Sequence, residues 1–443
     1  MIQTPPTSVD TLIIGAGLAG LSTALHLGPD ADLCVVEALD HVGGKARTER
    51  IGDFLFDVTG HWLHLRDPGI KNLIFSLLRE DQFHKVDRIS RIWSHGVITE
   101  YPFQANTFGL PPAVIHDCLM GAIDAASKRS ASVSPADEPE NFADWIRFYF
   151  GEGIARHFMV PYNAKLWGVP ANEISSRWCQ RFVPKPELSD IVAGAVGHNA
   201  SKMGYNAHFL YPKTGGIQSV SEALADAVGR GRIHLNTPIE SVDVSARLVV
   251  LRGGQKVKYR RLVNTTALPT FVSRLSDVPA SVALASSRLR ATEVVYFNAG
   301  VRGPLGLPDH WVYVPEDEWP MYRVGSFSNA VPSMAPPGHG SLYIELSDRT
   351  TPPEALKPRI IEGLCKMGFL QSPDQIVFME LRRIPNGYVI YDFDYPTSRE
   401  AVHTFLKEQG LLSIGRYGDW NYSSMEDALI DGRNAARRLV SEI

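Results

Sequence analysis

The sequence predicts an α/β fold made of more than one domain, and three observations carry this prediction. The chain begins with a strand, a helix and a second strand, at residues 11–14, 18–27 and 33–36. Its middle part, residues 105–195, carries apolar residues at helical spacing. Residues 290–395 contain several strand-like runs typical of a mostly antiparallel sheet. A chain of 443 residues is also too long for a single core.

The first strand is a short apolar run, suited to burial on both faces. Gly15, Gly17 and Gly20 follow it and form a G-x-G-x-x-G motif at the expected strand-to-helix turn. Gly15 permits the tight turn, Gly17 lets a pyrophosphate approach the backbone, and Gly20 lets the helix pack close to the strand. The helix directs free N–H groups and its positive dipole end at the same point. The motif therefore predicts a Rossmann-like unit that binds a dinucleotide.

The second strand ends in Glu37. A carboxylate at this position accepts hydrogen bonds from both hydroxyls of an adenosine ribose and repels a 2′-phosphate. The pair Gly43 and Gly44 lets a second loop reach the pyrophosphate, and Arg47 supplies a counter-charge. These features favour FAD over NAD as the cofactor.

The C-terminal segment predicts further contacts with the cofactor. Residues 411–414 read as a strand, residues 415–420 as a turn and residues 424–440 as a helix, whose first turn carries a capping box of Ser424 and Asp427. Its N-terminus can point at the cofactor, although a helix that only packs on the sheet is an alternative. The complete predicted FAD set is Gly15, Gly17, Leu18, Ala19, Gly20, Glu37, Ala38, Gly43, Gly44, Lys45, Arg47, Gly60, His61, Gly415, Arg416, Tyr422, Ser424 and Met425.

The remaining segments predict two further units. Asn141 is a candidate N-cap for a helix that begins at Phe142, and a short helix from Ile154 is expected to end at Pro161. We assign the domains as follows: residues 1–60, 212–285 and 396–443 form the Rossmann-like FAD-binding domain; residues 105–195 form an inserted helical subdomain; and residues 61–104, 196–211 and 286–395 form an antiparallel sheet domain for the substrate.

Composition excludes several classes of partner. The formal net charge is −4, so no excess of basic residues indicates binding to nucleic acid or to anionic lipid. The four cysteines lie far apart without metal-binding spacing, which predicts no metal site and a reducing, cytoplasmic location. The apolar start is broken by glycines and lacks a basic leader, so we expect neither a targeting segment nor an integral membrane segment.

Longer strings of residues narrow the family. The opening resembles the large FAD family of amine oxidases and protoporphyrinogen oxidases. HFMVPYNAKLWGVP at residues 157–170 and HWVYVPEDEWPMYRVGSFSN at residues 310–329 resemble the UDP-galactopyranose mutases, closest to their eukaryotic type. The resemblance implies an isomerase that interconverts pyranose and furanose forms of a nucleoside-diphosphate hexose through an adduct between the sugar and N5 of reduced flavin. It also implies NAD(P)H or another reductant for activation, and leaves a homo-oligomer open.

The same resemblance assigns roles to individual residues. His61, Arg323 and Arg181 become the catalytic candidates, although the local pattern alone favours a core histidine at His61 and only the resemblance raises it above that interpretation. Arg323 would grip the diphosphate with Tyr388 and Tyr422. Tyr101 and Phe158 would sandwich the base, with Gln104 and Asn163 at its edge. The predicted substrate set is Tyr101, Phe103, Gln104, Phe158, Asn163, Trp167, Trp311, Tyr313, Arg323, Tyr388 and Tyr422.

Two departures from the family pattern concern the site. An ungapped match places Phe182 where the second diphosphate arginine belongs, so Arg181 after a local shift, or Lys185, would have to serve. The first glycine of the family's Gly-Gly-His is Thr59. Two other functions stay open, namely an FAD oxidase or dehydrogenase of the amine-oxidase or protoporphyrinogen-oxidase kind, and a non-catalytic binding protein on the same scaffold.

Overall fold

A computed structural model describes residues 4–131, 138–179, 183–198 and 208–441. The first large sheet has the order β10-β11-β12-β1-β2-β9, with β18 paired to β12. Its central strands are parallel, whereas β10, β11 and β12 form an antiparallel meander. The strand bounds are β1 Ser8–Ile14, β2 Leu33–Val36, β9 Ile233–His234, β10 Ile239–Asp243, β11 Leu248–Leu251, β12 Lys256–Asn264 and β18 Leu411–Ser413.

Helices close to both chain termini pack together beside this sheet. The predicted helix after the glycine motif is α1, Leu18–Leu27, and it packs against α15, Met425–Ser441, and α8, Gln218–Val228. Gly432 makes the crossing of α1 and α15 close, because a Cβ there would meet the backbone of Ala19. The other helices of this region are α2 Pro68–Leu77, α9 Leu268–Val272, α10 Ala280–Arg288, α13 Tyr395–Glu408 and α14 Gly415–Gly418. The short helix α14 replaces part of the turn expected at residues 415–420.

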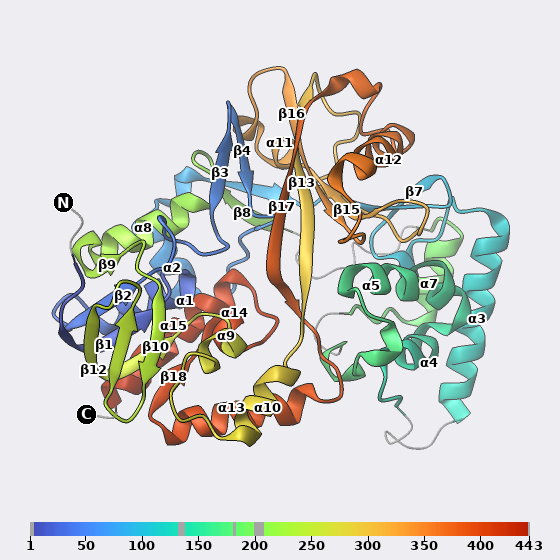
Figure 1. Cartoon of the computed structure of the whole chain (residues 1–443). Helices are drawn as coiled ribbons and strands as arrows, with labels where there is room; N and C mark the ends of the chain where they lie inside the picture. Colours follow the sequence, from blue (N-terminus) through green and yellow to red (C-terminus); the bar gives the residue numbers. More distant parts are fainter. Residues whose placement is uncertain (1–3, 132–137, 180–182, 199–207, 442–443) are drawn as a thin grey trace.

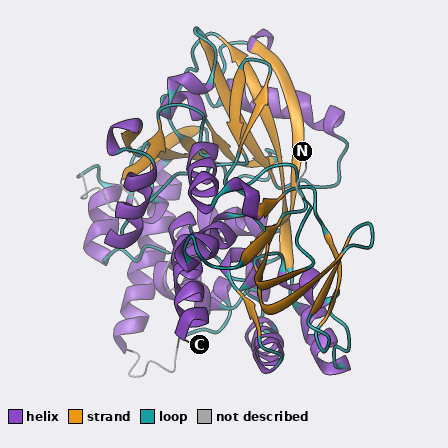
Figure 2. Ribbon diagram, turned by 90° about the vertical axis from the view of Figure 1, so that its left-hand side faces the viewer, coloured by secondary structure: helices purple, strands orange, loops and turns teal. Residues whose placement is uncertain are grey.

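The second large sheet has the order β17-β13-β16-β15-β14-β6-β7 and is antiparallel except for the pair β14–β6. In Figure 2 its long strands stand together in the upper part of the molecule. The bounds are β6 Ser90–Ser94, β7 Val97–Glu100, β13 Ala291–Arg302, β14 Trp311–Tyr313, β15 Met321–Gly325, β16 His339–Leu346 and β17 Ile376–Val389. The helix α12, Pro353–Lys366, shares a core with it, and the short α11 spans Phe327–Ala330. Two small antiparallel pairs complete the strands: β3 Thr48–Ile51 with β4 Phe54–Asp57, and β5 Phe83–Asp87 with β8 His208–Pro212.

A helical unit lies on one side of the second sheet, and the first sheet lies on its opposite side (Figure 1). It consists of α3 Pro112–Ala131, α4 Phe142–Ile154, α5 Val160–Trp167 and α7 Leu188–Ala195. The expected helix end at Pro161 is wrong. A π-helical segment, Ala155–Met159, joins α4 to α5, and Pro161 is the second residue of α5, so the helical path continues through this proline.

The α/β fold class, with its dinucleotide-binding sheet, inserted helices and antiparallel sheet, is therefore confirmed. The residue ranges assigned to the three domains stay a prediction. Among the described residues, none of the helices has both the length and the apolar character needed to cross a bilayer.

Candidate active site

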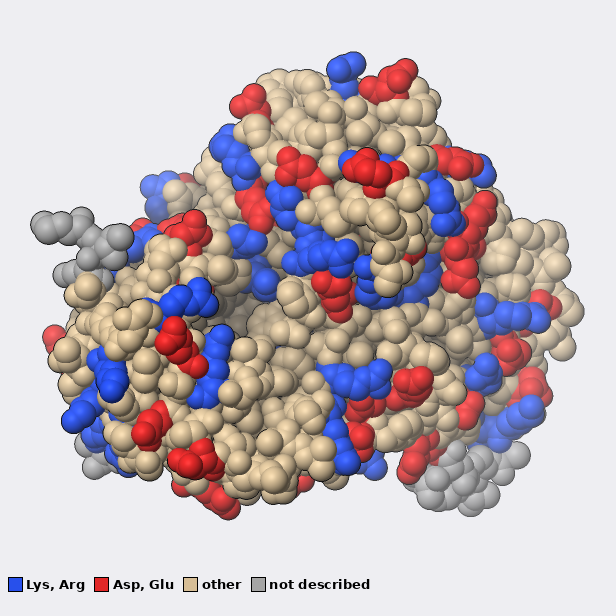
Figure 3. Space-filling view, viewed as in Figure 1, with Lys and Arg blue, Asp and Glu red and all other residues tan. Residues whose placement is uncertain are grey.

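A cavity of about 600 Å³ lies where the first sheet, the second sheet and the C-terminal segment meet. Figure 3 shows this face of the molecule hollowed near its centre, with Lys and Arg side chains along the edge of the hollow. The cavity wall carries the cations Lys45, Arg88, Arg323 and Arg416 against two carboxylates, those of Glu37 and Asp427. An anionic ligand is therefore favoured there over a cationic one.

The glycine motif forms one end of the cavity. Gly15 has a φ of 103°, and a Cβ on it would clash with Oγ1 of Thr265. A Cβ on Gly20 would clash with the carbonyl oxygen of Gly15, so this glycine serves the packing of α1. A Cβ on Gly17, in contrast, would meet no protein atom within 4 Å. Gly17 therefore borders open space at the N-terminus of α1, which fits the pyrophosphate of FAD.

Glu37 lies at the end of β2 and is held by the backbone. Its Oε2 accepts a hydrogen bond from the N–H of Ala16 at 2.8 Å, and its Oε1 accepts one from the N–H of Leu39 at 3.0 Å. Each carboxylate oxygen keeps a further lone pair for a ribose hydroxyl. The position and orientation of Glu37 thus fit an adenosine ribose.

Most of the predicted FAD set lines the cavity, but three residues do not: Gly20, Ala38 and Arg47. The guanidinium of Arg47 pairs with Glu49 at 2.7 Å and bonds to His41 at 3.1 Å. Glu49 also pairs with Arg382 at 2.8 Å. Arg47 is thus engaged in an ion-pair network beside the cavity.

Strand register builds the polar side of the cavity. Tyr313 on β14 pairs with Arg323 on β15, which pairs with Glu345 on β16. The Nη2 of Arg323 donates to Oε1 of Glu345 at 2.6 Å and to the hydroxyl of Tyr388 at 3.1 Å, and its Nε donates to Oε2 of Glu345 at 3.1 Å. Within the described part of the chain, Nη1 of Arg323 makes no hydrogen bond. Glu345 is fully buried, so it orients the guanidinium from behind.

Two tyrosines extend this surface. The rings of Tyr388 and Tyr422 stack with centroids 6.0 Å apart. Burial raises the pKa of Tyr388 to about 12, so its hydroxyl keeps its proton at neutral pH. Burial disfavours the charge of Arg323, but Glu345 together with the surrounding tyrosines outweighs this effect and holds the pKa of Arg323 well above its ordinary value. We call Arg323, Tyr388 and Tyr422 the polar wall.

His61 also lines the cavity, so the structure places it with the cofactor set. Burial lowers its pKa to about 4, which leaves the imidazole neutral at physiological pH. Its Nδ1 lies 3.4 Å from the carbonyl oxygen of Thr59. Thr59 has a φ of 60°, a left-handed conformation that a β-branched residue rarely adopts and that glycine adopts freely.

The predicted base-binding residues do not form an open slot. Phe158 stacks between Phe103, at 4.8 Å, and Tyr162, at 5.3 Å; we call these three rings the base-side cluster. Tyr101 lies elsewhere, with its ring 5.3 Å from that of Tyr313 and 5.2 Å from the guanidinium carbon of Arg88. The structure therefore does not bring Tyr101 and Phe158 together around an empty space.

The other predicted substrate residues divide in the same way. Gln104 donates to the carbonyl of Pro184 at 2.8 Å, and Asn163 donates to the carbonyl of Met159 at 2.7 Å. Trp167 is buried with its ring 5.8 Å from that of Tyr388. None of these three lines the cavity, whereas Trp311 and Tyr313 do.

The second diphosphate arginine has no described counterpart, because Arg181 lies outside the described residues. The alternative, Lys185, is engaged elsewhere. Its Nζ lies 3.8 Å from the ring centroid of Tyr149 and 4.8 Å from that of Trp145, both on α4.

Among the cavity residues that were missed from the sequence are His64 and Arg88. His64 lies three residues after the predicted His61, but nothing in the local pattern indicates that it shares the cavity. Arg88 precedes β6 and reaches the cavity only through the pairing of that strand with β14. A sequence pattern along one segment does not report such a cross-strand approach.

Comparison with solved structures supports the resemblance seen in the sequence. Reduced UDP-galactopyranose mutase superposes with a TM-score of 0.92 and 25% identity, over 98% of this chain and 94% of that one. A putative protoporphyrinogen oxidase from Exiguobacterium sp. 255-15 superposes with a TM-score of 0.75 and 15% identity, over 99% of this chain and all of that one. The resemblance to UDP-galactopyranose mutase is thus confirmed.

Curated relatives are more distant and cover less. They include a probable flavin-containing monoamine oxidase A from Dictyostelium discoideum, 23% identical over 62% of this chain and 60% of its own length. Coproporphyrinogen III oxidase from Mycobacterium tuberculosis is 26% identical over 55% of this chain and 53% of its own length. The chain thus spans about half to three fifths of these relatives. The family model of the flavin-containing amine oxidoreductases matches residues 18–440, and the chain belongs to this family of FAD enzymes.

Proposed function

We propose that this protein is a flavin-dependent mutase that interconverts the pyranose and furanose forms of a nucleoside-diphosphate hexose of the UDP-galactose type, with no net oxidation. The observation that supports the proposal is the polar wall, which shares one cavity with the glycine motif. The residues suited to a diphosphate therefore face the same cavity as the residues suited to FAD.

The polar wall suits a departing diphosphate. Breaking the bond between the anomeric carbon and the β-phosphate leaves negative charge on that phosphate. Arg323 faces the cavity as a fixed cation, and it is already oriented by Glu345 before the ligand arrives. Tyr388 stays protonated and can donate a hydrogen bond to the same group. Oriented donors of this kind stabilise the leaving group without reorganisation during the reaction.

Bound and reduced, FAD supplies an electron-rich ring nitrogen as the nucleophile toward the anomeric carbon. The chain's own task is to bind that ring system and the sugar in contact with each other. Trp311 and Tyr313 lie on the cavity wall and suit the apolar faces of a hexose. His61 is neutral, so it adds no charge beside the ring system.

An amine oxidase is the alternative that the curated relatives favour. Such an enzyme takes up an amine and passes reducing equivalents to oxygen. The cavity wall carries four Lys and Arg side chains against the two carboxylates of Glu37 and Asp427, and this excess of positive charge disfavours a protonated amine. It suits a diphosphate ester instead.

The proposal is tested by product analysis. The dithionite-reduced protein is incubated with UDP-, GDP- and dTDP-hexoses, and the nucleotide sugars are separated by chromatography. We expect a furanose product from at least one UDP-hexose, no product from the oxidised protein, and no stoichiometric consumption of reductant. Turnover by the oxidised protein, or peroxide release with an amine panel and no furanose product, would contradict the proposal and support the oxidase.

A further inference from the structure

Arg416 spans the gap between the two tyrosines of the polar wall. It lies on α14, where its Nη1 donates to the carbonyl of Ser423 at 2.8 Å and its Nη2 donates to the carbonyl of Gly387 at 2.9 Å. Gly387 directly precedes Tyr388, and Ser423 directly follows Tyr422. One guanidinium thus joins the two backbone segments that carry the tyrosine rings.

The same guanidinium also touches both rings. Its central carbon lies 4.7 Å from the ring centroid of Tyr422 and 5.6 Å from that of Tyr388. A planar guanidinium can lie over aromatic faces while its edge donates in fixed directions, and an ammonium group cannot combine these contacts. Both the planar shape and the charge of the Arg416 guanidinium therefore contribute to its contacts with the two rings and the two carbonyls.

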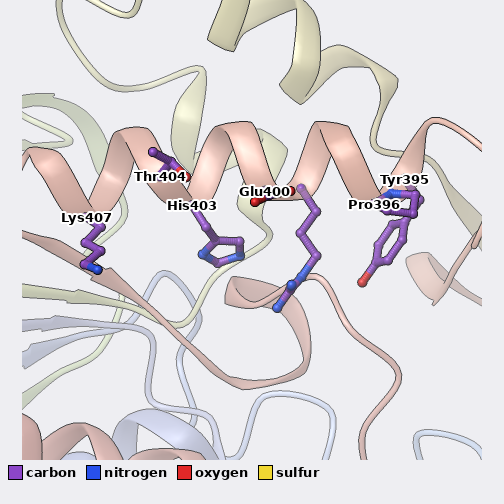
Figure 4. Close-up of a pocket in the computed structure, with 7 residues that line it drawn as sticks. Tyr395, Pro396, Glu400, His403, Thr404 and Lys407 are labelled. Atoms are coloured by element: carbon purple, nitrogen blue, oxygen red, sulfur yellow. The ribbon is translucent and has the colours of Figure 1, made fainter.

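The loop that carries Tyr422 is held from its other side by residues beyond β17. The hydroxyl of Tyr391 donates to Asn421 and accepts from the N–H of Tyr422, both at 2.6 Å. The hydroxyl of Tyr395 donates to the carbonyl of Trp420 at 2.8 Å. Figure 4 shows Tyr395 and His403 extending from one side of α13, and Nε2 of His403 lies 3.4 Å from the carbonyl oxygen of Asp419.

We propose that Arg416 is a positioning residue, which sets Tyr388 and Tyr422 for contact with a diphosphate. Two of its nitrogens donate to the backbone on either side of the site, and its guanidinium lies over both phenol rings, so the contacts of Arg416 fix where these rings lie. This inference rests on the proposed function for the identity of the ligand.

The test is a double-mutant cycle read out by UDP binding to the FAD-loaded protein. Arg416→Lys keeps the charge and loses the two-carbonyl bridge, and Tyr422→Phe loses one hydroxyl. We expect each single change to weaken UDP binding about tenfold, and the double variant to bind little worse than either. Once Tyr422 is displaced, its hydroxyl no longer contacts the ligand, so removing that hydroxyl costs no further affinity. FAD content should stay at the wild-type level in all variants.

A matched control is Arg232→Lys. Arg232 also bridges backbone carbonyls, those of Gly28 and Ala31, but away from the cavity. It should leave UDP binding unchanged. Additive losses in the cycle, or loss of FAD from Arg416→Lys alone, would overturn the proposal and make Arg416 a direct ligand.

A separate, ligand-free measurement tests the positioning role if the proposed function is wrong. If the wild-type protein does not bind UDP, the identity of the ligand is wrong, and the positioning role is tested without a ligand. The melting temperatures of Arg416→Lys, Tyr422→Leu and the double variant should then be non-additive, because both changes remove the same contact. Additive shifts would reject the positioning role itself.

Discussion

The polar wall and the base-side cluster differ in how their side chains are held. Arg323 is fixed by the register of three paired strands and by a buried carboxylate, and it faces the cavity. Phe158, in contrast, lies on the π-helical segment between α4 and α5, and its ring is covered on both faces by other rings. The diphosphate side of the site is thus already formed, whereas the base side is filled by its own side chains.

The two regions show which parts of such a site can form before the ligand binds. A charged group needs a partner when it is removed from water, so Glu345 holds Arg323 in place whether or not an anion is present. Aromatic rings gain energy by packing on each other, so they close the space that a base would occupy. A base that is to lie against Phe158 therefore has to displace a ring of its present stack.

The largest expected effect is that of Arg323→Ala. We expect kcat/KM for the UDP-hexose to fall about 1,000-fold or more, since a fixed donor to the developing charge is lost. The fully buried Glu345 is left unpaired, which should lower the free energy of unfolding by about 3 kcal/mol. Steady-state kinetics and urea unfolding measure the two losses.

Arg91→Ala is the matched control. Arg91 pairs with Asp309, another fully buried carboxylate beside the same sheet, but it lies away from the cavity. It should lower stability to a similar extent and leave UDP affinity unchanged. Equal losses of UDP affinity in both variants would show that the effect of Arg323 is structural only.

Phe158→Ala addresses the base-side cluster. Removing the middle ring of a buried stack leaves a cavity, so the free energy of unfolding should fall by about 3 kcal/mol. Because the diphosphate side does not depend on this ring, inorganic pyrophosphate should bind as it does to the wild type. Urea unfolding and pyrophosphate competition give the two readouts, and a parallel loss of pyrophosphate binding would remove the distinction between the two sides.

Gly17→Ala and Gly20→Ala separate cofactor binding from packing. A Cβ on Gly17 projects into open space, so the variant should fold and lose FAD affinity by about 100-fold, or about 2.7 kcal/mol. A Cβ on Gly20 clashes with the backbone of Gly15, so that variant should instead lose stability. Flavin absorbance per chain and the melting temperature of the FAD-free protein distinguish them. A stable, yellow Gly17→Ala protein would contradict the assigned cradle.

The smallest effect concerns pH. Burial lowers the pKa of His310 to about 4, and His310 is buried behind the cavity, whereas His61 faces the cavity. The unfolded chain takes up this proton near pH 6.5, and the folded chain does so only near pH 4. Stability is thus complete above about pH 6.5 and is lost as the pH falls toward 4. Between pH 6 and 5 the contribution of His310 should fall by about 1 kcal/mol, and His310→Gln should reduce the measured pH dependence by that amount, while His61 and His64, whose pKa values are also lowered to about 4, keep their own contributions. An unchanged slope in that variant would contradict the assignment.

Much of the cofactor side could be predicted because its signals are local. The spacing of Gly15, Gly17 and Gly20 and the acid at Glu37 lie within one strand–helix–strand unit, and their geometry follows from that unit. Arg47 could not be placed in the same way, because its partner Glu49 and the contact of Glu49 with Arg382 depend on how β3 meets β17.

The substrate-binding residues were predicted from the family resemblance, and the local spacing of residues alone would not have indicated them. Tyr313, Arg323 and Glu345 meet only through strand pairing across long loops, which no spacing rule reports. The stacking of Phe158 on Phe103 depends on the approach of the 103–105 turn to the π-helical segment. Such contacts between segments decide whether an aromatic residue faces a ligand or the core.

We propose that Arg323, oriented by Glu345, binds a diphosphate within reach of the cofactor. A crystal structure of the reduced, FAD-loaded protein with UDP tests it most directly. We predict that a phosphate oxygen lies about 3 Å from the guanidinium of Arg323, with Glu345 still paired behind it. A diphosphate bound elsewhere, with Arg323 contacting only Glu345 and Tyr388, would contradict the assignment of Arg323 as the diphosphate-binding residue.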